Sequence, residues 1–215
     1  MILLSHQGVG DLILINGLVR SLANHYDRIR IPVRERNLVS IAWMYSDLEN
    51  VYVEPLKHED SMECYREVGE PVVGLGFYAN DDTFDRSKFD QEFYRQAGVP
   101  FQHRWDAFYV PQPEVLDLVE RETPYAFMHE DVDRGFAIDK NRLPEFTRYT
   151  PGMSDNIFSF MPLIENATEI HVIHSAFLAL ADSLPLKATR LVIHDYARQL
   201  GEAMPALRYP WTLEK

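Results

Sequence analysis

The chain opens with the apolar run Met1-Ile2-Leu3-Leu4-Ser5, and two residues later comes the glycine-containing run Gly8-Val9-Gly10-Asp11-Leu12-Ile13. A short apolar run that ends just before two glycines is typical of a buried strand. Apolar residues then recur with helical spacing over Asp11–His25, at Leu14, Leu18, Val19 and Leu22. This order predicts a strand, a ligand-binding loop at its carboxyl end, and a helix.

The same alternation of strands and helices continues along the chain. Further strands are predicted at Arg28–Val33, Val51–Pro55, Val72–Phe77, Tyr125–His129, Glu145–Tyr149, Glu169–Ile173 and Arg190–His194. Further helices are predicted at Leu38–Leu48, Met62–Val68, Asp85–Ala97 (closed by Gly98), Glu114–Glu122, Asp155–Glu165 (capped by Asp155) and Ser175–Ser183. Alternating strands and helices imply parallel sheets with right-handed crossovers.

A cluster of prolines divides this pattern into two parts. Pro100, Pro111 and Pro113 punctuate the middle of the chain, and the strand–helix alternation starts again after them. We therefore expect an α/β protein with two small Rossmann-like halves of about four strands each, residues 1–110 and 111–215. A single flavodoxin-like sheet with a different ligand is an alternative, but the restart of the pattern counts against it.

Composition excludes several classes of function. The 215 residues include 21 Lys and Arg but 33 Asp and Glu, a net charge of -12, which argues against nucleic acid or an anionic lipid surface as the main partner. No stretch approaches the ~18 apolar residues of a membrane span, and the N-terminus does not resemble a signal peptide. Cys64 is the only cysteine, so intrachain disulfides and thiolate metal sites are excluded. We expect a cytoplasmic protein.

Asp11 is the first candidate for a catalytic residue. The loop lacks the Gly-Lys-Ser/Thr of a P-loop, and Ile13 occupies the third glycine position of a dinucleotide fingerprint. A carboxylate at a helix N-terminus stays ionised and can accept a proton from a substrate hydroxyl. The alternative is structural: Asp11 caps the helix, while Gly8 and Gly10 form the turn.

The second half offers a candidate anion site. In the run His174-Ser175-Ala176-Phe177, Ser175 is a natural N-cap for the helix that follows a predicted strand. Backbone N–H groups at such a helix start bind phosphate oxygens without a metal. A diphosphate is the expected ligand. The alternative is that Ser175 only caps the helix and that His174 is a polar residue at the sheet edge.

A polar run, His129-Glu130-Asp131-Val132-Asp133-Arg134-Gly135, follows the first strand of the second half. Its carboxylates invite a metal hypothesis, but such clusters are more often solvated, and no metal site is predicted. Arg134 is the better candidate, because a guanidinium group binds phosphate oxygens bidentately. We expect His129 and Arg134 beside the diphosphate; an ordinary surface arginine is the alternative.

Two stretches together resemble heptosyltransferase-type GT-B glycosyltransferases. Gly8–Leu14 with Leu18–Leu22 is similar to the opening of those enzymes, and Leu163–Glu169 with His174–Asp182 is similar to their donor-binding half. The resemblance implies two halves facing a cleft, in a form shorter than the usual family members. It further implies a base at Asp11 and a donor diphosphate over the backbone of Ala176 and Phe177.

The function implied is a metal-independent, inverting transfer of a sugar from a nucleotide diphosphate donor to a hydroxyl acceptor such as a saccharide, with no cofactor. An oxocarbenium-like transition state needs a base and a stabilised leaving diphosphate, and these residue types supply both. Two alternatives stay open: a non-catalytic nucleotide or nucleotide-sugar binder, and a sugar-nucleotide epimerase or hydrolase using His129 and Glu130. Thin halves also suggest a homodimer that covers apolar surface.

Overall fold

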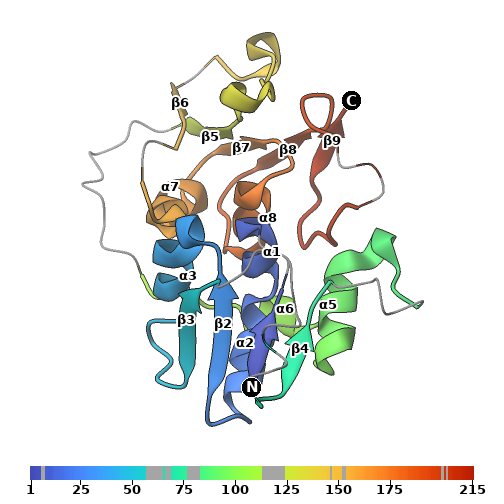
Figure 1. The fold of residues 1–215 in the computed structure, drawn as a ribbon. Coiled ribbons are helices and arrows are strands. Elements are labelled where there is room, and N and C mark those ends of the chain that lie inside the picture. The colour runs from blue at the N-terminus through green and yellow to red at the C-terminus, as the bar shows by residue number, and fades with distance from the viewer. Residues whose placement is uncertain are drawn as a thin grey trace. The chain divides into compact units, whose positions relative to one another are not determined.

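Figure 1 shows the computed structural model of the chain, which describes residues 1–5, 8–56, 65, 69–76, 83–112, 124–145, 147–151, 154–199, 201 and 203–215. The chain forms two compact units. The first unit comprises Met1–Pro111 and Glu202–Ala206, and the second comprises Gln112–Gly201 and Leu207–Lys215. Because Glu202–Ala206 returns to the first unit, a single boundary along the sequence does not describe the division.

The first unit is built on a four-stranded parallel sheet with the strand order β3-β2-β1-β4. Its strands are β1 (Ile2–Leu4), β2 (Ile29–Val33), β3 (Val51–Pro55) and β4 (Val72–Gly74), and its helices are α1 (Val9–Leu14), α2 (Asn16–Ala23), α3 (Leu38–Met44), α5 (Phe89–Ala97) and α6 (His103–Asp106). Every residue of β1 is buried, as expected of a parallel strand covered on both faces. Helix α2 packs on α6, α3 on β3, and α5 on β4.

The second unit is built on a five-stranded parallel sheet with the order β6-β5-β7-β8-β9. Its strands are β5 (Tyr125–His129), β6 (Thr147–Tyr149), β7 (Glu169–Val172), β8 (Arg190–His194) and β9 (Thr212–Glu214), and its α-helices are α7 (Met161–Glu165) and α8 (Ala176–Ser183). The rings of Phe127 and Phe177 pack at 5.6 Å, which places α8 on one face. Met128 packs with Ile138 on the other face, under residues 136–143.

Most of the predicted elements are confirmed, including the exact bounds of β3, β5 and β8. Gly98 closes α5 in the left-handed conformation, with φ 67°, as predicted. The predicted helices Met62–Val68 and Glu114–Glu122 lie outside the described residues, apart from Tyr65. The second sheet has one strand more than the four predicted for that half, because three residues near the C-terminus pair with β8 as β9.

Two predicted helix starts are wrong in detail. The first helix begins at Val9, so Gly10 lies in its first turn rather than in the loop, and its N-cap is Gly8 rather than Asp11. The helix also divides at Ile15, where the buried Asn16 turns inward and bonds the backbone of Tyr109 at 3.0 and 3.1 Å. Asn156, not Asp155, caps the 3-10 helix Ile157–Phe160, because its Oδ1 accepts from the Phe158 amide.

The strand orders locate where ligands bind in such sheets. In each sheet, successive strands are first added on one side of the first strand and then on its other side. The change falls between β1 and β4 in the first unit and between β5 and β7 in the second. Loops that leave the carboxyl ends of strands on either side of such a switch point diverge and leave room for a ligand. The loop of Gly8 follows β1, and the loop of Ser175 follows β7, so both predicted loops lie at switch points.

Candidate anion site of the second unit and candidate base of the first

Ser175 sits at the start of α8, beside the second switch point. Its Oγ accepts a hydrogen bond from the Phe177 amide at 3.3 Å, so the predicted N-cap is confirmed. The amide of Ala176 belongs to the first turn of α8, where no intrahelical acceptor exists. The positive end of the α8 dipole therefore points out of the turn between His174 and Ala176.

His129, the last residue of β5, lies against this turn. Its Nδ1 is 3.1 Å from Ser175 Oγ, and its ring packs on the Phe177 ring with 4.3 Å between centroids. The pKa of His129 is lowered to about 4, chiefly by burial, which Asp131 and Glu130 oppose and to which the charge of Arg198 adds. The imidazole is therefore neutral at pH 7, and its Nδ1 shares a hydrogen bond with the Ser175 hydroxyl, which orients Oγ.

The buried side chain of His174 holds the turn in place. It is only 2% exposed, and its Nε2 lies 2.9 Å from Oδ1 of Asp195, which directly follows β8. Arg198, three residues further on, donates from its guanidinium group to the His174 carbonyl oxygen at 2.5 Å. Asp195 and Arg198 in the loop after β8 thus bind the side chain and the backbone carbonyl of His174 in the loop after β7.

Two guanidinium groups near this turn share one aromatic ring. Arg134 and Arg198 each lie over the ring of Phe136, at 5.4 and 5.2 Å from its centroid. Arg134 is exposed and pairs with Asp131 at 3.2 Å, while burial and the charge of Arg134 lower the pKa of the half-buried Arg198. An anion that contacted both guanidinium groups would be stabilised by both positive charges.

In the first unit, Asp11 is the third residue of α1 and is half-buried. Its carboxylate folds back over the start of the helix, because a Cβ placed on Gly8 would lie 2.7 Å from Asp11 Oδ2. Gly8 is therefore the residue that admits this side-chain position. The helix start favours a negative charge at this position.

The structure brings together five of the predicted residues: His129 and His174–Phe177 surround one turn. Arg134 joins them through Phe136 and Arg198. Sequence reasoning missed Asp195 and Arg198. The signal was available, because both follow the predicted strand Arg190–His194, and the carboxyl ends of parallel strands share one edge.

The structure was compared with known proteins. No protein-family model and no curated protein matches the chain. Among solved structures, it superposes on the bacterial iron-containing dodecameric glycosyltransferase TibC from enterotoxigenic E. coli with a TM-score of 0.60 and 12% identity, covering 100% of this chain and 62% of that one. The chain is similar in fold to a heptosyltransferase. The sequence resemblance described above is thereby confirmed for the fold.

A second match supports the same likeness. The dodecameric iron-containing heptosyltransferase TibC in complex with ADP-D-beta-D-heptose gives a TM-score of 0.55 at 13% identity, covering 90% of this chain and 57% of that one. The chain thus spans about three fifths of the length of the proteins it matches. Among the helices of the described ranges, none has the length and hydrophobicity needed to cross a bilayer.

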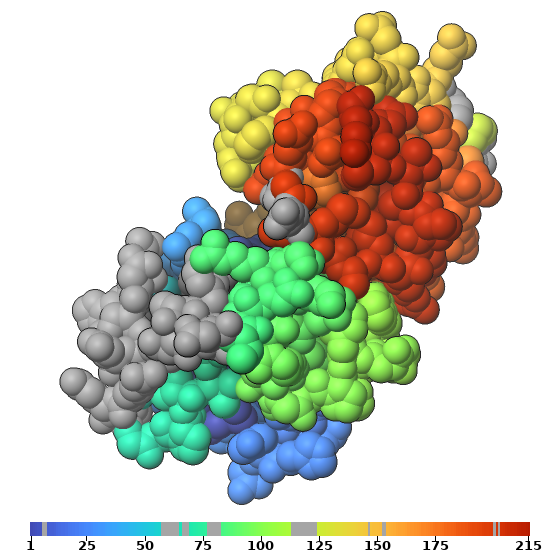
Figure 2. Space-filling view, turned by 90° about the vertical axis from the view of Figure 1, so that its right-hand side faces the viewer, coloured from blue at the N-terminus to red at the C-terminus, as the bar shows by residue number. Residues whose placement is uncertain are grey.

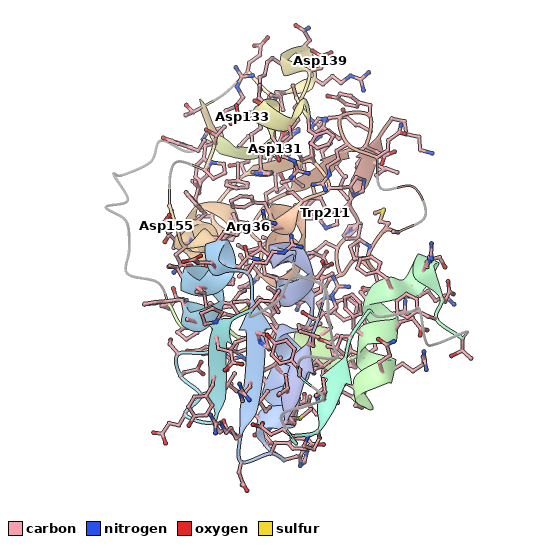
Figure 3. All side chains as sticks on the ribbon, in the orientation of Figure 1. Arg36, Asp131, Asp133, Asp139, Asp155 and Trp211 are labelled. Carbon is pink, nitrogen blue, oxygen red and sulfur yellow. The ribbon has the colours of Figure 1, made fainter. Side chains whose placement is uncertain are left out.

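The described residues do not fit an iron site like the one for which those glycosyltransferases are called iron-containing. Figure 3 labels Asp131 and Asp133 beside β5, in the polar run that suggested a metal. There Glu130 pairs with Lys140 and accepts from the Ile138 amide, and Asp131 pairs with Arg134. Within the part of the chain that is described, no three His, Cys, Asp or Glu side chains gather around a point that could hold a metal ion.

Proposed function

We propose that the chain is a metal-independent, inverting glycosyltransferase that moves a sugar from a nucleotide diphosphate donor to a hydroxyl acceptor. One observation carries the proposal: the start of α8, capped by Ser175, and the two guanidinium groups of Arg134 and Arg198 lie on the same edge of the second sheet, at its switch point. Helix amides and paired guanidinium groups are the groups with which proteins bind phosphate.

In this proposal the second unit binds the donor. The diphosphate contacts the first turn of α8 at Ala176 and Phe177, with Arg134 and Arg198 on its other side. As the bond to the sugar breaks, negative charge grows on the departing diphosphate. Fixed N–H dipoles and guanidinium groups stabilise that charge without reorganising, which lowers the barrier.

The first unit supplies the base. Asp11 accepts the proton of the acceptor hydroxyl as the oxygen forms its bond to the anomeric carbon of an oxocarbenium-like sugar. The attack comes from the face opposite the leaving group, so the configuration inverts. The nucleotide leaves as a diphosphate, and the charge balance closes with one proton transferred to Asp11 and released to solvent.

Two measurements test the proposal together. Thermal shift with a panel of nucleoside mono- and diphosphates, with and without EDTA, should show a metal-independent rise in the melting temperature with one diphosphate. Incubation with the corresponding nucleotide sugars should then release diphosphate only when a hydroxyl acceptor is present. Binding without turnover would favour the non-catalytic nucleotide binder. Donor consumption without acceptor would favour a hydrolase or epimerase, and either result would overturn the transferase.

A further inference from the structure

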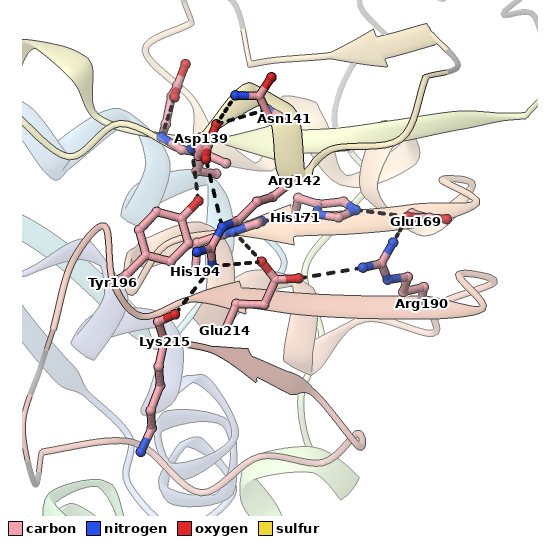
Figure 4. A network of polar contacts seen from close by, with 12 residues as sticks. Asp139, Asn141, Arg142, Glu169, His171, Arg190, His194, Tyr196, Glu214 and Lys215 are labelled. Carbon is pink, nitrogen blue, oxygen red and sulfur yellow. Dashed lines mark hydrogen bonds and ion pairs between the residues drawn. The ribbon is translucent and has the colours of Figure 1, made fainter.

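The face of the second sheet that is remote from α8 carries a line of four titratable side chains (Figure 4). Glu169 and His171 lie two residues apart on β7, and His194 on β8 is the register partner of Glu214 on β9. Strand register places all four on the same face. Both imidazoles have 0% exposure, so the line runs through the interior.

Three contacts join the four groups in sequence. Glu169 Oε2 lies 2.9 Å from His171 Nε2, and His171 Nδ1 lies 3.0 Å from His194 Nε2. His194 Nδ1 then lies 3.4 Å from Glu214 Oε2. The first two contacts have hydrogen-bond lengths, and one N–H on each neutral ring is enough to make both. Two neutral imidazoles therefore complete the contacts from Glu169 to His194 without an added proton.

A proton added to His194 would place a further positive charge near two arginines. Arg190 on β8 reaches Glu169 at 3.3 Å and Glu214 at 3.6 Å. Arg142 lies 3.8 Å from Glu214. Both carboxylates of the line are therefore already paired with arginines. The other charged or titratable neighbours are Lys140, which pairs with Glu130, Asp139, which pairs with Arg142, Tyr196, whose ring packs on His194, and Lys215, whose carbonyl oxygen accepts from Arg142.

This environment holds His194 in its neutral form. The pKa of His194 is lowered to about 4, first by burial and then by the charges of His171, of the two arginines and of Lys140. Burial also lowers the pKa of His171, although Glu169 opposes that effect. A histidine in water has a pKa of about 6.5. The enclosed ring of His194 therefore binds a proton more weakly than a hydrated ring does.

Strand β9 is the removable side of this enclosure. It has only three residues, and it stands last in the strand order of the second sheet, so it pairs with β8 alone. The chain just before it is fastened separately, to α8. There the buried Asp182 accepts from the Arg208 amide at 2.9 Å and from the indole N–H of Trp211, labelled in Figure 3, also at 2.9 Å. Strand β9 can therefore leave β8 while the chain up to Trp211 stays in place.

We propose that the line is an acid-sensitive clasp: at neutral pH two neutral histidines are enclosed by β9, and in acid β9 leaves β8 so that His194 takes up a proton in contact with water. The C-terminal residues lie at the surface next to residues 131–145, where this opening would occur (Figure 2). Opening also exposes the hydrogen-bonding groups along the edge of β8. This device acts independently of the proposed sugar transfer.

The physical reason is that a charged imidazole is stable in water and costly in the interior, so proton uptake and opening favour each other. Because the pKa of His194 is lower in the closed form, that form keeps its full advantage above about pH 6.5 and loses it as the pH falls towards 4. With pKa values of about 4 closed and about 6.5 open, the equilibrium constant for opening should rise roughly 20-fold between pH 7 and pH 5.

The test is amide exchange of the full chain between pH 7 and pH 5, with nitrogen NMR of the histidine rings in the same samples. The Asp195 amide reports on β9, because it donates to the Glu214 carbonyl oxygen at 2.8 Å. Its protection, relative to the intrinsic exchange rate at each pH, should fall by roughly 20-fold. The Thr168 amide, which donates to the Tyr125 carbonyl oxygen at 2.9 Å, should keep its protection.

Substitutions of His194 decide whether its proton is the cause. His194→Gln does not titrate in this range, so Asp195 should be equally protected at pH 7 and pH 5. His194→Asn tests the same point if the first variant does not fold. The matched control is His129→Gln, because His129 is a second histidine of the same sheet whose pKa is lowered to about 4. This variant should lose protection at Asp195 as the wild type does.

Glu214→Gln identifies the group that titrates. Without the carboxylate, a charge on His194 is even less favourable in the closed form, so Asp195 should lose at least as much protection in acid as in the wild type. If protonation of Glu214 itself released β9, this variant would lose the pH dependence, and the proposal would be overturned.

Results from the wild type alone can also overturn the proposal. One is protection at Asp195 that stays constant or rises between pH 7 and pH 5. Another is an equal loss at Thr168, which would mean that the whole unit loosens. A His194 ring that titrates at the ordinary histidine pKa of about 6.5 would show that it is not enclosed.

Discussion

The two units place the same local element, a strand followed by a loop and a helix, at the switch point of a parallel sheet, but they equip it with opposite chemistry. In the first unit the helix start is held by Gly8 and carries the carboxylate of Asp11. In the second unit the helix start is capped by the Ser175 hydroxyl and is flanked by the guanidinium group of Arg198.

This difference separates two tasks that one site could not combine. A carboxylate folded over a helix start occupies the positive end of the helix dipole and repels a second anion. A hydroxyl leaves that end open, and neighbouring guanidinium groups add positive charge for phosphate oxygens. The first unit is therefore suited to accept a proton, and the second to hold a leaving anion.

The substitution expected to have the largest effect on sugar transfer is Asp11→Asn. The amide cannot accept the hydroxyl proton, so sugar transfer should fall by about 10²- to 10⁴-fold, the usual contribution of a general base. Donor binding, measured by calorimetry, should be unchanged. The control is Asp85→Asn, because Asp85 is a second carboxylate at a helix start in the first unit, where it accepts from the Ser87 amide. Equal rates in the two variants would contradict the assignment of Asp11 as base.

Arg198→Ala tests the anion site of the second unit. Loss of a charge-assisted contact should weaken binding of the nucleoside diphosphate by about 1.5–3 kcal/mol, or roughly 10- to 100-fold. Arg198→Lys should recover part of the affinity, since it keeps the charge but not the bidentate geometry. Arg148, exposed on β6, provides the control Arg148→Ala. Unchanged affinity in Arg198→Ala would mean that the diphosphate binds elsewhere.

The neutral state of His129 can be tested through the pH dependence of stability. Its pKa is about 4 in the folded chain and about 6.5 when unfolded, so between these values the unfolded chain binds more protons. Its contribution is complete above pH 6.5 and is lost as the pH falls towards 4, with a slope of at most about 1.4 kcal/mol per pH unit. The free energy of unfolding, measured with urea at a series of pH values, should fall less steeply with decreasing pH in His129→Gln than in the wild type.

His25→Gln is the matched control for that titration, because His25 is an exposed histidine of the first unit. Its slope should equal that of the wild type. If His129→Gln and His25→Gln gave the same pH dependence, the buried, neutral state assigned to His129 would be wrong.

Ser175 allows capping and anion binding to be separated. Ser175→Ala removes the cap and should lower the free energy of unfolding by about 1 kcal/mol. Ser175→Asp keeps a capping acceptor, and therefore stability, but places a negative charge at the anion site and should abolish diphosphate binding. Urea unfolding and calorimetry measure the two effects. A Ser175→Asp protein that binds the diphosphate normally would show that Ser175 only caps the helix.

Prediction from sequence succeeded where the cause is local. The strand Tyr125–His129 follows from a short apolar run, and the Ser175 cap follows from a hydroxyl residue ahead of an apolar helix. The helix division at Ile15 was not predictable in this way, because Asn16 is turned inward by Tyr109, 93 residues away. Strand β9 was missed for the same reason: three residues have no periodicity, and only their pairing with β8 makes them a strand.

The sequence alone therefore determined the alternation of strands and helices, the two α/β halves, and the presence of Asp11 and Ser175 at the starts of helices, because hydrophobic periodicity and capping act between near neighbours. The tertiary structure decided the strand orders, and with them which loops meet. It brought Arg198 to the Ser175 turn, and it aligned His171 with His194 and Glu214. Such groupings depend on which strands become neighbours in the sheet, which spacing along the chain does not encode.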